Sequence, residues 1–490
     1  MKAFRILMVN LGLPPESRGG TEYYTQNLSR SLADKGHKLG IFCALGDLAH
    51  KNYSVRKTSQ NDISVYRIST SHLFAKKFAD FFIDHRVNQE FSKVIRDFKP
   101  DVIHFHHLAY LSANLPEIAH KLGIPSIMTL HDYWYICYRS RLLRPNNQIC
   151  PGPDKGKHCA NCDDGVAPNP TKIAKHPNLL RLLHSPSIKK LVDQSLQIIP
   201  HDQISQVKGF ITGSGSSKAA TFIEPDQETI QNHKFRFDTF AKQLVFPRLL
   251  LSPSVHLKKR YEKAGIENIK LLPLGFEKYA SIPPIAFNGT LKLTFLGSLE
   301  MHKGVRELIA ELYLLKNTNV KVTLNVYGHP KDPIYAALLK KSVEESDTIK
   351  IIFHGSYESD KDLSQVLKDC HFVVFPSIWE ENYPLVIREA LLHGRPVIAS
   401  NLGGASECIR HYENGFLYNP LVAGELKELL LSLNHSKVIE KLQRGACNSI
   451  IEPMTDHVNK VLRLYQDVVK KEIYPILQDI TPQKTVSIKI

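Results

Sequence analysis

The chain has 490 residues, which is too long for one ordinary hydrophobic core and fits two domains with additional segments. Its 43% hydrophobic and 23% charged residues are typical of a soluble globular protein, and no apolar run approaches the roughly 18–20 residues of a membrane-spanning helix. The net charge of +15 indicates an anionic partner, such as a nucleotide or a phospholipid surface. Nucleic acid is not expected, because the chain has no long basic run and no helix-turn-helix, zinc-finger or RNA-binding signature.

The first half of the chain alternates short apolar strands with helices. Residues 6–10 predict a buried strand, because the basic, apolar N-terminus lacks the length and the cleavage site of a signal peptide. A helix is expected over 22–35, and further strands over 39–45, 101–107 and 124–134. This alternation predicts a parallel sheet flanked by helices. A dinucleotide cofactor is not supported, because no G-x-G-x-x-G motif follows the first strand.

The middle of the chain is less regular. Residues 152–243 are rich in Pro, Ser, His and Lys, and we interpret them as an insertion with some helices. Strands return at 244–254 and 269–275, and a proline-bearing segment around 282–290 predicts an interdomain linker. The first domain is therefore expected over residues 1–285, with the insertion inside it.

The second half repeats the pattern of the first. A second α/β domain is expected over 290–455, followed by a C-terminal helix over 456–475. Its strands are predicted at 291–297, 320–328, 349–355, 372–376 and 396–400.

Two glutamates, Glu381 and Glu389, are separated by seven residues with Pro384 between them. Because proline is tolerated best at the start of a helix, Glu381 is expected in the preceding loop and Glu389 one to two turns inside. Asn382 and Tyr383 would then offer free backbone N–H groups to hydroxyls or anions. An ordinary surface helix could also carry this spacing. The flanking strands favour a ligand site, because ligands bind at the carboxyl ends of parallel strands.

This segment resembles the donor-sugar motif of the retaining GT-B glycosyltransferases of family 4, also called glycosyl transferases group 1. The resemblance implies an α/β protein of GT-B architecture, with two doubly wound Rossmann-like domains, an interdomain cleft and a C-terminal helix that crosses back to the first domain. The matching positions are Pro376, Ser377, Glu381, Pro384, Glu389, Ala390, Gly394, Pro396, Val397, Gly403, Gly404, Glu407, Asn414 and Gly415.

The resemblance also implies a role for each donor-side residue. Glu381 would contact hydroxyls of the transferred sugar, and Glu389 would bind the nucleotide ribose. Asn382 and Tyr383, which precede Pro384 in the same donor-binding segment, would offer backbone N–H groups to the sugar or the phosphate.

A second donor-binding segment runs from Gly297 through Ser298 to Lys303. A lysine at a helix N-terminus after a glycine-bearing loop is a diphosphate site on physical grounds, although an ordinary surface lysine is the alternative. In the resembling family an arginine often follows the glycine, where this chain has Ser298. Arg306 or a residue of the first domain could replace that arginine.

Gly19 and Gly20 follow the first strand. Paired glycines let the backbone approach a ligand closely, and a plain turn is the equal alternative. The resemblance implies that this loop closes over the donor phosphates and borders the acceptor site.

Three histidines, His104, His106 and His107, stand at the end of a predicted strand. Their spacing could suggest a metal, but the resemblance implies that donor binding and catalysis need no metal or cofactor. It also places His106 near the transferred sugar, in a catalytic set with Lys303 and Glu381. No protein nucleophile is evident in the sequence.

His131 and Asp132 end the next strand and are expected to point into the same cleft. Their chemistry suits acceptor binding or proton handling.

Four of the eight cysteines lie close together in the sequence, at Cys137, Cys150, Cys159 and Cys162. Four thiols in so short a stretch could hold a structural zinc, although the spacing is not that of a common zinc ribbon. Disulfides are the alternative and would require an oxidising compartment.

The sequence therefore predicts a retaining glycosyltransferase that uses a nucleotide-diphosphate sugar. The expected partners are a glycan or lipid-linked acceptor and an anionic membrane contacted peripherally, and the expected location is the cytoplasm or the inner face of the membrane. Two alternatives stay open. One is a GT-B sugar-nucleotide epimerase. The other is a non-catalytic nucleotide-sugar-binding protein of the same fold, which Ser298 favours.

Overall fold

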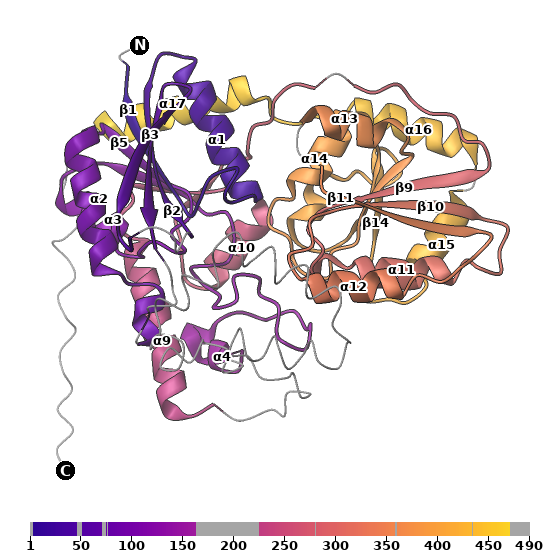
Figure 1. Ribbon diagram of the computed structural model, residues 1–490, viewed down its shortest axis with the longest axis horizontal. Helices are drawn as coiled ribbons and strands as arrows, with labels where there is room; N and C mark the ends of the chain where they lie inside the picture. Colours follow the sequence, from indigo (N-terminus) through magenta and orange to yellow (C-terminus); the bar gives the residue numbers. More distant parts are fainter. Residues whose placement is uncertain are drawn as a thin grey trace.

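The structure is a computed structural model, and two α/β domains lie side by side in it (Figure 1). Part of the predicted insertion, residues 163–224, and the end of the predicted C-terminal segment, residues 471–475, lie outside the described residues. The structure describes residues 3–46, 51–70, 75, 77–162, 225–279, 281–357, 360–433 and 435–470.

The first domain is built on an eight-stranded sheet with the order β3-β4-β2-β1-β5-β6-β7-β8. Neighbouring strands are parallel, except for the antiparallel pair β3–β4 at one edge. The strands are β1 (Arg5–Asn10), β2 (Lys38–Leu45), β3 (Val55–Gln60), β4 (Ile63–Ser69), β5 (Val102–Phe105), β6 (Ser126–Thr129), β7 (Leu249–Ser252) and β8 (Ile269–Leu271).

Helices cover both faces of this sheet, and each face has its own apolar core. In α2, the Asp84 side chain caps the N-terminus by accepting hydrogen bonds from two backbone N–H groups, and apolar residues recur every three or four positions along the buried face. The helical elements are α1 (Gly20–Ala33), η2 (Phe78–Phe81), α2 (His85–Phe98), α3 (Leu115–Lys121), η3 (Asp154–Gly156), α4 (Lys157–Ala160), α9 (Gln227–Gln243) and α10 (Val255–Lys263).

The second domain is built on a six-stranded parallel sheet with the order β11-β10-β9-β12-β13-β14. Its strands are β9 (Thr290–Leu296), β10 (Lys321–Tyr327), β11 (Ile349–Gly355), β12 (Phe372–Phe375), β13 (Val397–Ser400) and β14 (Gly415–Tyr418). Its helical elements are η4 (Met301–Lys303), α11 (Val305–Tyr313), α12 (Pro333–Lys341), α13 (Asp360–Lys368), α14 (Leu385–Leu392), η5 (Gly403–Cys408), α15 (Glu425–Ser432) and α16 (Ser436–Cys447).

The last described helix, α17 (Met454–Lys470), lies against the first domain rather than the second (Figure 1). Its buried face shares a core cluster with Tyr24, Leu28 and Leu32 of α1. The chain therefore returns to its first domain at the end of the described sequence.

Each sheet has one place where the strand order reverses. In the first sheet β1 lies between β2 and β5, and in the second β9 lies between β10 and β12. Ligands of open α/β sheets bind at the carboxyl ends of the strands at such a switch point. The loops that follow β1, β5, β9 and β12 are therefore where a ligand site is expected, and they carry the glycine pair, His106, Lys303 and Glu381.

Candidate active site

A partly buried ion pair joins the loops that follow β9 and β12. The Glu381 side chain is nearly buried, and its Oε1 lies 2.6 Å from Nζ of Lys303. The same oxygen accepts hydrogen bonds from Nε1 of Trp379 at 2.9 Å and from Oγ of Ser377 at 3.2 Å. A buried carboxylate needs such partners because its desolvation is otherwise costly. Lys303 thus joins the two loops through this carboxylate oxygen, and the other two donors come from the loop of Glu381 itself.

Two glycines allow these loops to pack backbone against backbone. Gly304 has a φ of +73°, and a Cβ there would stand 1.9 Å from the carbonyl oxygen of Pro376. A Cβ on Gly404 would stand 2.0 Å from the carbonyl oxygen of Asn382, and the Gly404 N–H donates to the carbonyl of Glu381 at 2.6 Å. A side chain at Gly304 would push the ion-paired loops apart, and one at Gly404 would push η5 away from the loop that carries Glu381.

Helix α14 starts at Leu385, directly after Pro384, so Glu381 lies in the loop and Glu389 lies inside the helix. This is the arrangement that Pro384 predicts. Gly20, at the start of α1, faces this helix, since a Cβ there would lie 3.3 Å from the Leu385 side chain. The glycine-bearing loop of the first domain thus lies against the donor segment of the second.

Side chains of the donor segment also contact the first domain. Nδ2 of Asn382 donates to the carbonyl of His131 at 3.3 Å, while its buried Oδ1 has no hydrogen-bond partner among the described residues. The Tyr383 hydroxyl donates to the carbonyl of Leu274 at 3.4 Å, and the Arg388 guanidinium lies 3.3 Å from the centre of the Tyr383 ring. A buried, unpaired amide oxygen beside Glu381 is a group that a ligand hydroxyl could satisfy.

The first domain contributes a cluster of buried histidines. Nδ1 of His106 lies 3.1 Å from Nε2 of His131, and the rings of His104 and His106 are 4.1 Å apart. His104 is held at both nitrogens, by the Tyr465 hydroxyl at 2.7 Å and by Oγ1 of Thr129 at 2.8 Å. Nε2 of His106 is buried and has no partner within the described ranges.

These histidines are neutral. Burial is the largest cause that lowers the pKa of His104 and of His131, and with the smaller contribution of neighbouring histidines each pKa is about 3. The pKa of His106 is well below its usual value for the same reasons, and burial is again the largest. Neutral imidazoles donate one hydrogen bond and accept one, so this cluster can orient hydroxyl groups without adding positive charge.

Helices α1 and α17 hold the histidine cluster in place. The Tyr24 hydroxyl of α1 lies 2.7 Å from Nε2 of His457 on α17, and the Tyr24 ring contacts the rings of His106 and His131. Local sequence patterns could not have revealed these supports, because His457 and Tyr465 lie more than 300 residues away in the sequence from Tyr24 and His104, which they contact.

The neighbours His131 and Asp132 have different partners. Oδ2 of Asp132 lies 3.0 Å from Nε2 of His107, and its Oδ1 accepts from the Trp134 N–H at 2.8 Å. His131 instead contacts His106. The structure therefore brings His131 together with His106 and keeps the Asp132 carboxylate with His107.

Further contacts close the domain interface. The Glu407 carboxylate accepts from the N–H groups of Val255 and His256, at 3.1 Å and 2.6 Å, and so caps helix α10 of the other domain. Nη2 of Arg260 lies 3.0 Å from Oε2 of Glu380. The candidate site thus lies where the two domains meet.

Two family models match the chain and together cover more than half of it. "Glycosyltransferase Family 4" matches residues 18–151, and "Glycosyl transferases group 1" matches residues 290–435. The chain belongs to the group 1/family 4 glycosyltransferases. The first match contains the glycine loop and the histidine cluster, and the second contains both loops of the partly buried ion pair.

One curated relative of this family is an Escherichia coli UDP-Gal:alpha-D-GlcNAc-diphosphoundecaprenol alpha-1,3-galactosyltransferase. It is 26% identical over 231 residues, which is 41% of this chain and 54% of the relative. The chain spans between about a third and a half of the first curated relatives that it matches.

Solved structures share the whole fold at low sequence identity. The sucrose-phosphate synthase of Thermosynechococcus elongatus superposes with a TM-score of 0.59 at 15% identity, covering 94% of this chain and 98% of that one. Anabaena Alr3699/HepE in complex with UDP and glucose gives a TM-score of 0.54 at 15% identity, covering 94% and 99%. The fold is therefore GT-B, as the sequence predicted.

The structure does not support the predicted zinc site. No group of three or more His, Cys, Asp or Glu residues in the described ranges is placed to hold a metal ion. All four cysteines are buried, and Cys137 and Cys150 belong to the core of the first domain. Burial raises the pKa of Cys159 to about 12 and that of Cys162 to about 11. Cys137 accepts a hydrogen bond from the Leu142 N–H, and the Cys150 thiol donates to the carbonyl of Gly152.

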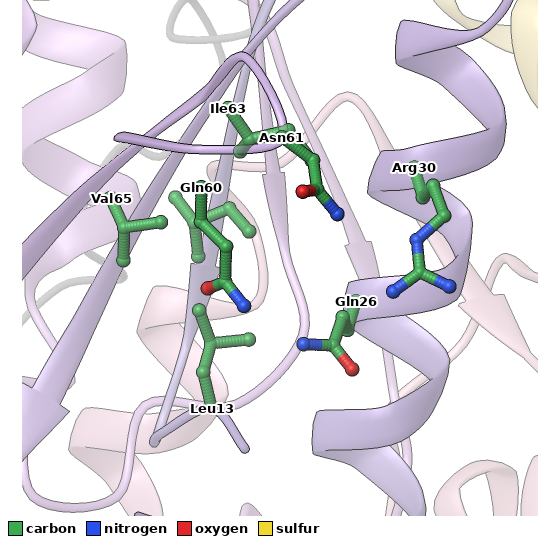
Figure 2. A pocket seen from close by; sticks show the side chains of 8 residues that line it. Leu13, Gln26, Arg30, Gln60, Asn61, Ile63 and Val65 are labelled. Carbon is green, nitrogen blue, oxygen red and sulfur yellow. The ribbon is translucent and has the colours of Figure 1, made fainter. Parts of the chain in front are cut away.

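A shallow pocket of the first domain lies apart from these residues. Figure 2 shows Gln26 and Arg30 of α1 on one side of it, opposite the turn that joins β3 to β4. None of the donor-side or histidine-cluster residues lines this pocket. No helix within the described residues is both long and apolar enough to cross a membrane.

Proposed function

We propose that this protein is a retaining glycosyltransferase that moves a sugar from a nucleoside-diphosphate sugar to a hydroxyl acceptor. Family membership supports the reaction class, and the resemblance of the donor segment to that of retaining enzymes supports retention. A UDP-bound structure of the same fold supports a nucleotide-sugar donor.

The pair formed by Lys303 and the buried Glu381 carries this proposal. Lys303 ends η4 and lies two residues before α11, where it can neutralise a leaving diphosphate, and the carboxylate beside it can accept hydrogen bonds from sugar hydroxyls. In the structure the Lys303 ammonium and the Glu381 carboxylate neutralise each other in an ion pair. Donor binding would therefore replace the Lys303–Glu381 ion pair with two contacts to the ligand. Lys303 would contact the diphosphate, and Glu381 would contact the sugar hydroxyls.

The reaction follows from these positions. The bond between the anomeric carbon and the diphosphate oxygen breaks, Lys303 and the Gly297–Ser298 loop stabilise the departing charge, and Glu389 holds the ribose. The acceptor oxygen then attacks the oxocarbenium-like carbon from the same face, and its proton passes to the leaving diphosphate. Gly19 and Gly20 would close over the phosphates. Neither a metal nor a protein nucleophile is required by this sequence of events.

The neutral histidines would serve the sugar and acceptor side. His106 carries a buried nitrogen that has no partner among the described residues, and the contact with His131 would hold the His106 ring in place. Asp132, which is paired with His107, would orient the acceptor through the same loop. This division gives His106, Lys303 and Glu381 the catalytic roles.

We further propose that the acceptor is lipid-linked and that the reaction belongs to cell-surface polysaccharide or glycolipid synthesis. The E. coli relative is named for a diphosphoundecaprenol-linked acceptor, and the net charge of +15 would favour an anionic membrane surface. We propose a cytoplasmic location at the inner face of the membrane, where peripheral contact would deliver the acceptor.

A donor panel tests the proposed function. The purified protein is incubated with UDP-, GDP-, ADP- and dTDP-sugars, first alone and then with a polyprenyl-diphosphate sugar acceptor. Thermal shift reports binding, release of nucleoside diphosphate reports turnover, and proton NMR of the product reports the anomeric configuration. We expect one donor to stabilise the protein and to transfer its sugar with the configuration retained.

Each alternative gives a different result in this experiment. A non-catalytic binding protein would show the thermal shift without transfer to any acceptor. An epimerase would convert the donor sugar to its epimer with no acceptor present. An inverted product would overturn retention while leaving the enzyme class intact.

A further inference from the structure

We propose that Arg141 supplies the second positive charge for the donor diphosphate. Members of the resembling family often have an arginine where this chain has Ser298, in the second domain. We infer that Arg141, in the first domain, replaces the positive charge of that arginine. The inference rests on the proposed function, because the ligand is the diphosphate of the nucleotide sugar.

Arg141 stands at the base of a small hairpin. Leu143 and Ile149 form an antiparallel bridge, and the Cys150 N–H donates to the carbonyl of Leu142 at 2.7 Å. Leu142, Leu143 and Cys150 are buried in the core of the first domain. The backbone at Arg141 is therefore held by core packing, which makes its guanidinium a positioned group rather than a mobile surface charge.

The hairpin docks onto the loop that contains the expected diphosphate site. Nη2 of Arg141 lies 3.2 Å from Oε1 of Glu300, whose Oε2 accepts from Oγ of Ser298 at 2.7 Å. Farther along the hairpin, Nδ2 of Asn147 contacts Sδ of Met301 at 3.6 Å. Glu300 thus tethers the guanidinium beside the side chain that stands in place of the family arginine.

Positive charge is in excess around this loop. Nζ of Lys331 also lies 3.6 Å from Glu300, so two cations share that carboxylate. Burial and, to a smaller extent, the charges of Arg141, Lys303 and Lys331 together lower the pKa of His302 to about 2. Because 42% of the Arg141 side chain is exposed, N–H donors remain open to a phosphate, for which the planar guanidinium fork is well suited.

The other candidate from the sequence, Arg306, is less suited to this role. Its Nε and Nη2 both lie within 3.1 Å of Oε1 of its neighbour Glu307, and 61% of its side chain is exposed. The guanidinium is thus already engaged with a neighbour on its own helix. Arg141 instead contacts the loop after β9 from the first domain. A diphosphate held between Arg141 and that loop would therefore link the two domains.

Isothermal titration of the full chain with UDP, GDP, ADP and dTDP tests the inference. We expect Arg141→Ala to weaken binding of the preferred nucleoside diphosphate about tenfold or more, the usual size of a lost charge-assisted hydrogen bond. Arg141→Lys should recover part of the loss. The matched control Arg144→Ala removes the same charge three residues along the same hairpin and should change the affinity less than twofold.

A second variant checks that the two positions serve the same phosphate. Adding Ser298→Arg to Arg141→Ala should restore binding to within a few fold of the wild type, and no recovery would overturn the shared role. Wild-type affinity in Arg141→Ala would overturn the inference and leave the proposed function standing. If the wild type itself binds no nucleoside diphosphate, the proposed function fails instead.

Discussion

The two domains meet at one interface but bring opposite chemistry to it. The second domain contributes charges, with Lys303 paired to Glu381 and Glu300 shared between cations. The first domain contributes imidazoles that burial keeps neutral, with His106 in contact with His131. Lys303, Glu381 and His106 follow strands at the switch points of their sheets, and His131 follows the neighbouring strand β6.

This difference shows how the two domains can divide the work of stabilising the diphosphate and positioning the hydroxyl groups. A leaving diphosphate needs positive charge close by, whereas a sugar or acceptor hydroxyl needs a positioned neutral donor or acceptor. A protonated histidine on the first domain would compete with Lys303 for the phosphates. Deep burial prevents that protonation, so the apolar packing around the histidines is itself part of the proposed chemistry.

The charged side should be the most sensitive to change. We expect Lys303→Ala to lower kcat/KM for sugar transfer by about 10²–10³-fold, because the departing diphosphate loses its charge partner and Glu381 is left buried and unpaired. Steady-state release of nucleoside diphosphate measures this. Lys316→Ala, which removes a surface lysine of the same domain that is paired with Glu344, should retain wild-type turnover. An equal loss of kcat/KM in Lys303→Ala and Lys316→Ala would contradict the role of Lys303 at the diphosphate.

The neutral side should respond more moderately. We expect His106→Ala to lower kcat/KM by about 10- to 100-fold, because a positioning hydrogen bond is lost without a change in charge. The pKa of His106 is well below its usual value, so kcat/KM of the wild type should show no histidine inflection between pH 6 and 8. A profile that rises with a midpoint near 6.5 and flattens in His106→Ala would show that this ring titrates during turnover.

The same burial predicts how stability depends on pH. The folded-state pKa of His104 and of His131 is about 3, below the value of 6.5 for a free histidine, so the unfolded chain binds more protons as the pH falls below 6.5. Each buried histidine then lowers the free energy of unfolding by about 1.4 kcal/mol per pH unit, and none of this loss occurs above pH 6.5.

Thermal unfolding at pH 7.0, 6.0 and 5.0 measures this dependence, at pH values above those where most carboxylates titrate. The melting temperature should fall below pH 6.5, and His104→Gln should reduce the slope. The exposed His329→Gln serves as the matched control and should leave the slope unchanged. A melting temperature that is constant from pH 7 to 5 would contradict neutral burial of the cluster.

The smallest effect concerns the support from α17. We expect Tyr465→Phe to lower the free energy of unfolding by about 1–2 kcal/mol, because one nitrogen of buried His104 loses its partner. Denaturant unfolding measures the change, and the exposed Tyr412→Phe is the control. If Tyr465→Phe is as stable as the control, α17 does not hold the histidine cluster through this bond.

Most of the fold could be predicted from the sequence because buried parallel strands are short continuous apolar runs. Residues 39–45 and 291–297 predict strands, and the structure places β2 and β9 there. The pair β3–β4 was missed, since the edge strand Val55–Gln60 is mostly polar and exposed. Strand β14, Gly415–Tyr418, was missed because its four residues follow a turn and carry little pattern of their own.

The sequence by itself determined the candidate donor segments, because Glu381, Pro384, Glu389 and Lys303 act through local order: a loop, a proline and a helix start. Only the tertiary structure decided what lies opposite them. It paired Lys303 with Glu381 and brought Tyr465 onto His104. It also gave Asp132 and His131 different partners and placed Cys137 and Cys150 in the core of the first domain. Such contacts join residues far apart in the chain, and burial sets their charge states, so no local pattern encodes them.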